Sequence, residues 1–323
     1  MKSPHKSLFL FLMVTSTCMV MSSSNWLTTW MGLEINMLGF IPLMYFKETT
    51  SESETAAKYL VPQALGSTIF ITSAMIALHS NTLQTLMPIA MCLKLGAAPL
   101  HFWFPPVMAG LPLLPAFLLL TWQKIAPIFA ISSFHPTIMA KIMPIAAISA
   151  LWGGIGGVNQ TDIRSLLTYS SIAHTGWMLA SINSPAPTLM LYITTYILIT
   201  TSVYMCLTKQ STKSHKQLFS FKEPHDSFLL AITILSLSGL PPLTGFFMKL
   251  LVLYFTEAST IITMSLILGA STSLLYYLSL TFSPLLSFNK ANFSKTKMIS
   301  KSSIMFFLIS DSTPILYCVL PLK

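Results

Sequence analysis

Three lysines lie inside apolar stretches of the sequence, where a charged group is costly. Lys124 is near the middle of residues 117–129, Lys94 is central in residues 87–99, and Lys249 lies nearer the end of its stretch. An ammonium group at the centre of a bilayer costs about 3 kcal/mol on insertion scales, so it needs a partner, a hydrated cavity or the loss of its proton. The alternative for each lysine is a side chain that extends to the membrane interface.

Glu34 is the acidic counterpart of these lysines, four residues after Trp30. Loss of water favours the neutral form of a lysine, whereas a nearby carboxylate favours the ammonium. Moving the carboxylate therefore changes whether the lysine holds its proton, and several such lysines in a row form a relay. Arginine is unsuited to this role because it stays protonated. A carboxylate that faces the membrane interface is the alternative for Glu34.

His174 lies in a span with the hydroxyl-bearing residues Tyr169, Ser170, Ser171 and Thr175. Histidine changes its charge near neutral pH, so it is suited to bridge two lysines of a relay or to hold a chain of water. A hydrogen-bonded histidine that only contributes to packing is the alternative, and both interpretations stay open.

The composition indicates which class of protein carries these groups. The 323 residues are 53% hydrophobic and only 8% charged, with a mean hydropathy of +0.70. This apolar content is typical of a membrane protein and excludes a cytosolic enzyme, a nucleic-acid binder and a disordered chain. The net charge of +9 is better explained by loops that stay on one side of a membrane than by a nucleic-acid partner.

Apolar runs between polar or proline-containing segments predict eleven spans. They cover residues 7–24, 30–46, 61–78, 86–104, 113–134, 138–158, 165–182, 188–207, 228–255, 261–282 and 303–320. With this count, one side of the membrane receives thirteen of the 18 basic residues: Lys2, Lys6, Lys47, Lys58, Arg164, Lys209, Lys213, Lys216, Lys222, Lys290, Lys295, Lys297 and Lys301. The other side receives only Lys141 and Lys323, as the positive-inside rule requires.

Two segments combine a lysine with proline and glycine, residues 94–112 and 237–249. Proline removes a backbone donor, and the freed carbonyl is tolerated at membrane depth only where it faces protein or water. These segments belong to the fourth and ninth spans, which indicates an inverted repeat with an ion path between its halves. A simple proline kink is the alternative. The sequence thus predicts a single all-α membrane domain, with repeats at about 7–134 and 138–282 and a last helix at 303–320.

No motif for a metal or a redox group is visible. The four cysteines lie far apart, and the glycines of residues 153–157 continue an apolar span rather than follow a strand. We read Gly153 and Gly157 as a small-residue helix contact. The basic connections 208–227 and 283–302 are contact surfaces for soluble partners or anionic lipid, or simply solvated loops.

Motifs over the whole chain resemble the chain 2 family of mitochondrial NADH-ubiquinone oxidoreductase, the smallest antiporter-like subunit of animal respiratory complex I. They are residues 30–42, Lys94-Leu-Gly with residues 99–103, and residues 121–127, 159–164, 169–178 and 238–246. The resemblance implies an antiporter-like subunit of the mitochondrial inner membrane, made on mitochondrial DNA, with its N-terminus in the matrix and its C-terminus in the intermembrane space.

The resemblance also implies roles for the charged residues. Glu34 and Lys94 would form a coupled ion pair, Lys124 would be the central relay lysine, and Lys249 would serve the second half-channel. The implied activity is H+-translocating NADH:ubiquinone reductase of the electron transport chain, with FMN, iron-sulfur clusters and ubiquinone in other subunits. Implied partners are membrane-arm and accessory subunits of complex I and phospholipids such as cardiolipin, with no nucleic acid. A stand-alone cation/proton antiporter and a structural membrane scaffold are the alternative functions.

Overall fold

A computed structural model describes residues 4–45, 50–77, 85–210, 224–241, 243–256 and 258–291. Every element in these ranges is an α-helix, and there are thirteen of them, α1 to α13. Five helical segments of the described ranges are long and apolar enough to cross a membrane: Thr50–Ala77, Leu113–Ser132, Pro136–Gly157, Ala186–Thr208 and Thr260–Phe282. The chain is therefore a multi-pass membrane protein.

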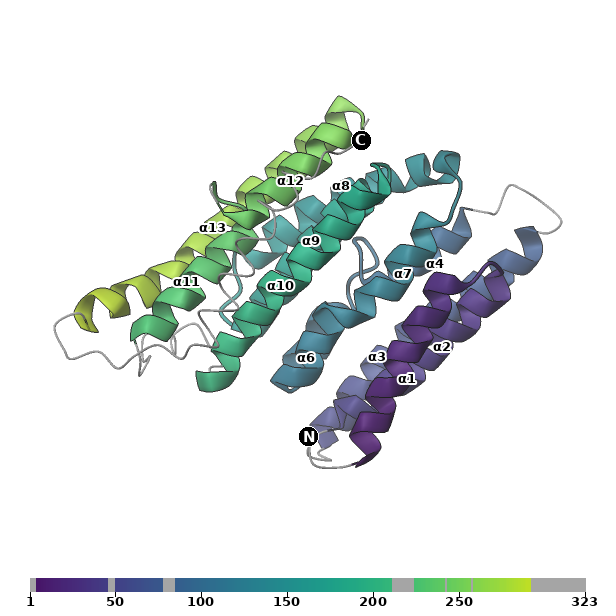
Figure 1. Ribbon diagram of the computed structural model, residues 1–323, viewed down its shortest axis with the longest axis horizontal. Helices are drawn as coiled ribbons and strands as arrows, with labels where there is room; N and C mark the ends of the chain where they lie inside the picture. Colours follow the sequence, from purple (N-terminus) through teal and green to yellow (C-terminus); the bar gives the residue numbers. More distant parts are fainter. Residues whose placement is uncertain are drawn as a thin grey trace. The chain divides into compact units, whose positions relative to one another are not determined.

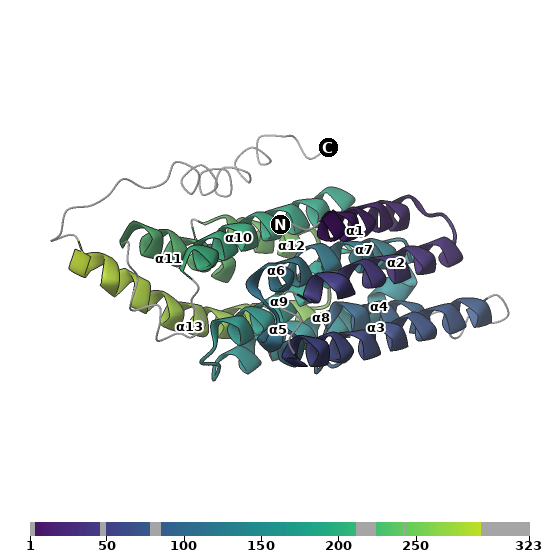
Figure 2. The ribbon, with the colours of Figure 1, turned by 90° about the horizontal axis from the view of Figure 1, so that it is seen from below.

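The chain divides into two compact units, Met1–Ser149 and Ala150–Lys323. The first unit contains α1 (Pro4–Ser22), α2 (Trp26–Met44), α3 (Thr50–Ala77), α4 (Leu86–Leu95), α5 (Phe104–Gly110), α6 (Leu113–Leu120) and α7 (Trp122–Ser132). Helices α1 and α2 lie side by side, and α4 packs against α3 and α7 (Figures 1 and 2). Gly32 permits the close approach of α1 and α2, because a Cβ there would lie 2.6 Å from the side chain of Val20.

The second unit begins within α8 (Pro136–Gly157) and continues with five helices. These are α9 (Ile163–Ser181), α10 (Ala186–Gln210), α11 (Pro224–Ser238), α12 (Thr244–Phe255) and α13 (Thr260–Ala291). Helix α11 packs against α13 and α10, while α9 contacts α10, α12 and α13 (Figure 1). Helix α9 is the core of this unit, since nearly all its residues from Leu166 to Ser181 are buried.

The two helix interruptions expected from proline and glycine are present. Helix α4 ends at Leu95 with Gly96 in the left-handed conformation, at a φ of 69°, and α5 begins at Phe104. Helix α11 ends at Ser238, and α12 begins at Thr244. The structure adds an interruption that the sequence analysis missed, at Thr121 between α6 and α7. Here Pro127 supplies no N–H for the carbonyl of Gln123, so the first turn of α7 lacks one hydrogen bond.

Two predicted boundaries differ from the structure. Helix α3 begins at Thr50, well before the predicted start of the span at residue 61, because its first turns contain charged residues that are compatible with a helix but not with an apolar run. Helix α13 continues to Ala291, beyond the predicted end at residue 282. The predicted helix 303–320 and most of the connections 208–227 and 283–302 lie outside the described residues.

Glycines of α8 allow close packing in the second unit, but they contact two different helices. A Cβ on Gly153 would meet the backbone nitrogen of Ala173 in α9 and would lie 2.7 Å from the carbonyl oxygen of Tyr169. A Cβ on Gly157 would instead lie 2.6 Å from the ring of Tyr276 in α13. Helix α8 therefore uses small residues to approach α9 and α13 separately.

We expect the substitution Gly153→Val to destabilise this packing by about 1–3 kcal/mol, because the added side chain must displace helix backbone rather than a flexible side chain. The amount of assembled protein in membranes and its thermal unfolding in detergent should both decrease. Ile155→Val, at a side chain that is 61% exposed on the same helix, is the matched control and should have little effect. Equal stability of the two variants would contradict the close α8–α9 contact.

Candidate functional site

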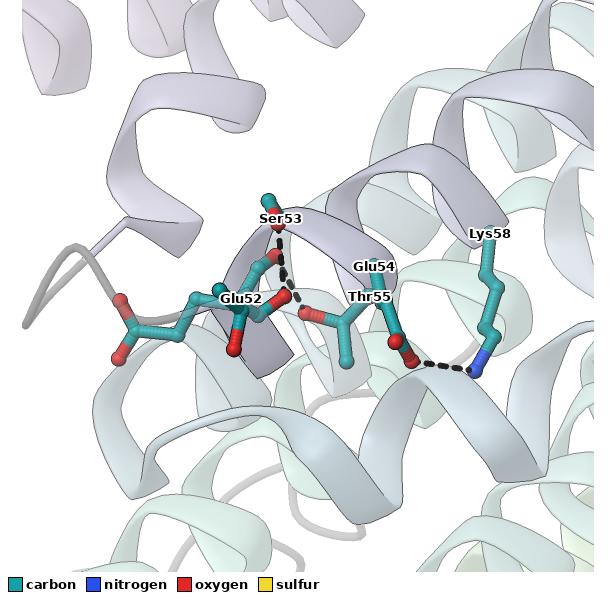
Figure 3. Close-up of polar contacts among 6 residues, drawn as sticks. Glu52, Ser53, Glu54, Thr55 and Lys58 are labelled. Atoms are coloured by element: carbon teal, nitrogen blue, oxygen red, sulfur yellow. Dashed lines mark hydrogen bonds and ion pairs between the residues drawn. The ribbon is translucent and has the colours of Figure 1, made fainter.

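The three lysines identified in the sequence are all buried within the protein. Lys94, Lys124 and Lys249 are only 6%, 4% and 8% exposed. A lysine that extends to the membrane interface would expose its ammonium end, so this alternative does not describe the structure. The exposed Lys58 of α3 provides the contrast, because it forms an ion pair of 3.4 Å with Glu54 one turn away (Figure 3).

Lys94 and Lys124 line the same cavity in the first unit. The cavity has a volume of about 20 Å³ that the centre of a water molecule can occupy, which is enough room for one water molecule. Part of its lining is polar, from the side chains of Asn36, Gln63 and Gln123. The two lysines thus share a small polar chamber between α2, α3, α4 and α7.

Lys94 lies in the last turn of α4, where free carbonyls need donors. The Gln63 side chain donates a hydrogen bond of 3.0 Å to the carbonyl of Lys94, and the Trp103 ring donates one of 3.1 Å to the carbonyl of Leu93. Gly66 of α3 makes room for the lysine stem, since a Cβ there would lie 2.8 Å from Cγ of Lys94. Among the described residues the Lys94 ammonium itself has no hydrogen-bond partner, so its solvation depends on the cavity.

Glu34 is half-buried on α2 and acts on the charge of Lys94. Within the part of the chain that the structure describes, the Glu34 carboxylate and the Lys94 ammonium do not form a direct ion pair. Their coupling is therefore through space, and a modest displacement of either group changes it. The predicted pairing of Glu34 with a buried lysine has a physical basis here, although its functional role stays a prediction.

Lys124 lies in the first turn of α7, directly after the interruption at Thr121. The neighbouring Gln123 side chain donates a hydrogen bond of 3.2 Å to Asn36 of α2. This bond fixes α7 against α2 and holds the polar lining of the cavity in place. Sequence reasoning missed Asn36, Gln63 and Gln123 as site residues, although amide side chains within apolar spans are a signal that could have found them.

Lys249 has a different environment, in the second unit. Its ammonium donates a hydrogen bond of 2.7 Å to the carbonyl of Ser238, the last residue of α11. In a continuous helix this carbonyl would accept from residue 242, but residue 242 is a proline and has no N–H. The ammonium also lies 6.0 Å from the centre of the Trp177 ring, within the range of a cation–π interaction. Lys249 therefore caps the negative end of an interrupted helix.

His174 is buried in α9, one turn before Trp177, and its Nδ1 lies 2.8 Å from the hydroxyl of Tyr192 in α10. The hydroxyl groups of its own helix also make bonds to the backbone. Ser170, Ser171 and Thr175 each donate to a backbone carbonyl of α9. Tyr169 packs beside Gly156 instead.

The structure thus places the five predicted site residues in two separate groups. Glu34, Lys94 and Lys124 belong to the first unit, and His174 and Lys249 belong to the second, where Lys249 lies by the Trp177 ring and His174 by Tyr192. Within the described residues, no group of three or more histidine, cysteine or acidic side chains is arranged to hold a metal ion. The chemistry that both groups support is the binding and release of protons by lysine and histidine.

Gly239 is expected to control the position of Lys249. Its φ of 82° disfavours any side chain, and a Cβ there would lie 3.1 Å from the lysine Nζ. Gly239→Ala should therefore displace the ammonium and destabilise the protein by about 1–2 kcal/mol, as measured by thermal unfolding of the purified protein. Ser238→Ala is the control and should have a smaller effect, because Lys249 contacts the backbone of Ser238 and not its hydroxyl. A larger effect of Ser238→Ala would contradict this assignment.

Comparisons with known proteins show the family to which the chain belongs. The chain matches the model of the family described as "NADH:quinone oxidoreductase/Mrp antiporter, TM" over residues 23–85 and 77–275. NADH-ubiquinone oxidoreductase chain 2 of Genetta servalina is 37% identical over 314 residues, covering 92% of this chain and 90% of the relative. The chain 2 protein of Didelphis virginiana is 40% identical over 293 residues, covering 86% and 84%.

Two solved structures have the same fold. A chain of respiratory complex I from Thermus thermophilus with bound aureothin aligns with a TM-score of 0.83 at 22% identity, covering 99% of this chain and 79% of that chain. A chain of the archaeal membrane-bound sulfane sulfur reductase aligns with a TM-score of 0.79 at 14% identity, covering 98% and 72%. At these identities the structures show the fold, whereas the relatives and the family model establish the lineage. The chain belongs to the NADH-ubiquinone oxidoreductase chain 2 family, within the transmembrane family of NADH:quinone oxidoreductases and Mrp antiporters.

Proposed function

We propose that the chain is an antiporter-like membrane-arm subunit of NADH:ubiquinone oxidoreductase, respiratory complex I, and that it carries part of a proton-translocation relay. Family membership supports the place of the chain in this complex. The observation that supports a relay is the burial of three lysines inside the protein, two of them in one polar cavity. Buried ammonium groups are costly, and a proton relay is a function that needs them.

In the first unit, the proposed relay uses Glu34, Lys94 and Lys124. The ammonium of Lys94 lines a cavity with room for water, so a proton can pass between it and Lys124 through a bridging water molecule. The charge of Glu34 favours the protonated form of Lys94. A change in the distance between these two groups would therefore load or release the proton.

In the second unit, the proposed relay uses Lys249 and His174. The free carbonyl of Ser238 and the Trp177 ring stabilise the charged form of Lys249. Because both contacts depend on the interruption between α11 and α12, a movement of this segment would favour proton release. His174 can exchange a proton with Tyr192 at 2.8 Å, depending on its tautomer.

The finer features predicted from the sequence complete this proposal. We infer eleven transmembrane helices in an antiporter-like inverted repeat, in the mitochondrial inner membrane, with the N-terminus in the matrix and the C-terminus in the intermembrane space. FMN, iron-sulfur clusters and ubiquinone would bind to other subunits, whose redox reactions drive the relay. Other membrane-arm subunits, accessory subunits and phospholipids such as cardiolipin would surround the chain.

A stand-alone cation/proton antiporter is the second candidate, and it is favoured by the inclusion of Mrp antiporters in the matching family. Such a protein should exchange sodium for protons in vesicles that contain this chain alone. A subunit of complex I should instead be unstable without its neighbours. Sodium-dependent proton movement by the isolated chain would support the antiporter.

We expect Lys124→Met in the assembled complex to reduce NADH-driven proton pumping by about 100-fold or more, because methionine fills the same space without exchanging a proton. Pumping is measured in vesicles with a pH-sensitive dye, and assembly is checked by native electrophoresis. Lys58→Met is the matched control, since the exposed Lys58–Glu54 pair contributes at most about 1 kcal/mol. Normal pumping by a fully assembled Lys124→Met complex would favour a structural scaffold.

A further inference from the structure

Helix α10 carries a row of four buried hydroxyl groups. Only the first of them, that of Tyr192, takes part in the relay proposed above. Tyr192, Tyr196, Thr200 and Tyr204 follow one another at intervals of four residues and are 0%, 2%, 4% and 4% exposed. Residues four apart lie on the same face of a helix. We call this row the α10 hydroxyl stripe.

The stripe begins at His174 and continues toward the start of α9. The Tyr192 hydroxyl is 2.8 Å from Nδ1 of His174, and the Tyr196 ring is centred 5.1 Å from the histidine ring. Tyr204, at the far end, interacts electrostatically with Arg164 in the first turn of α9. Twelve residues separate the two ends of the stripe, which corresponds to about 18 Å along the helix axis.

Packing alone does not explain these side chains. Phenylalanine and valine would fill the same volumes without a hydroxyl, and a buried hydroxyl costs about 1–3 kcal/mol unless it is hydrogen-bonded. The Cα atoms that carry successive hydroxyls are about 6 Å apart along the axis, so the proposed path would need water molecules between successive hydroxyls. The Thr200 hydroxyl donates to the carbonyls of Tyr196 and Ile197, at 2.8 and 3.0 Å, and its oxygen remains able to accept a hydrogen bond from water.

A hydroxyl group is suited to pass a proton without being changed by it. Its oxygen accepts a proton from one neighbour while its own proton moves to the next, and the group then reorients. No electron moves, and no group is left with a net charge. The end near Arg164 lies on the side that receives most of the basic residues, which is the matrix side in the proposed topology.

We propose that the α10 hydroxyl stripe is the path by which protons from the Arg164 side reach His174. The proposal rests on the proposed relay function, which it deepens by assigning an entry route to the second unit. Tyr277 of α13 lies beside this route and is electrostatically coupled to Tyr192 and Tyr196. It would provide a further hydroxyl at the inner end of the stripe.

Thr200 allows the sharpest test, because valine has nearly the same shape and serine keeps the hydroxyl. In the assembled complex, we expect Thr200→Val and Tyr196→Phe to lower NADH-driven proton pumping by about tenfold, equivalent to about 1.4 kcal/mol in the barrier. The solvent isotope effect on turnover in D2O should increase, because proton entry then limits the rate. Thr200→Ser should leave both the pumping rate and the solvent isotope effect near those of the unmodified complex.

Two further variants separate the possible outcomes. Thr233→Val removes a buried hydroxyl of α11 that donates to the carbonyl of Leu230, outside the stripe, and should leave pumping unchanged. Lys249→Met tests the relay itself and should abolish pumping. If Lys249→Met abolishes pumping but Thr200→Val and Tyr196→Phe behave like Thr200→Ser, the entry path is wrong and the relay stands. If Lys249→Met also pumps normally, the proposed function fails together with the path.

Discussion

A buried ammonium group in a membrane protein must be solvated by the protein, and this requirement shapes both units. The bilayer offers no hydrogen bonds, so each charge needs a carbonyl, an aromatic ring, a carboxylate or enclosed water. An intact α-helix cannot provide the carbonyl, because its backbone groups are already paired. The sequence therefore interrupts helices close to the lysines, at Gly96 after Lys94, at Thr121 before Lys124, and at Ser238 opposite Lys249.

These interruptions are possible because neighbouring helices satisfy the freed groups. At the end of α4, side chains of Gln63 and Trp103 take over the carbonyls that the helix leaves open. At the end of α11, the ammonium of Lys249 donates to the open carbonyl of Ser238. Each solution needs a close approach of two elements, which glycine provides at positions 66 and 239. At each of these two sites, a buried lysine thus lies beside an interrupted helix, and a small residue lets a second element come close.

The sequence was sufficient to predict the parts of this design that depend on local chemistry. Lysine within apolar sequence, and proline with glycine beside it, predicted the buried charges and two of the interruptions correctly. The partners of these groups depend on tertiary packing and were not predictable. Gln63 is 31 residues away from Lys94, and Tyr192 is 18 residues away from His174. The sequence showed only the hydroxyls on the same helix as His174, of which Ser170, Ser171 and Thr175 donate to carbonyls of their own helix. The interruption at Thr121 was missed because residues 113–134 are uniformly apolar except near Lys124.

The two units solvate their lysines in different ways, and the difference has a consequence for proton transfer. Lys249 donates a direct hydrogen bond to the carbonyl of Ser238, which stabilises its charged form, so in the proposed relay a change in geometry around Ser238 would favour release of its proton. Lys94 borders a cavity with room for water and interacts through space with Glu34, and both features respond to small displacements. In the proposed relay, the first unit would respond to a change in charge nearby, whereas the second would hold its proton until a helix segment moves.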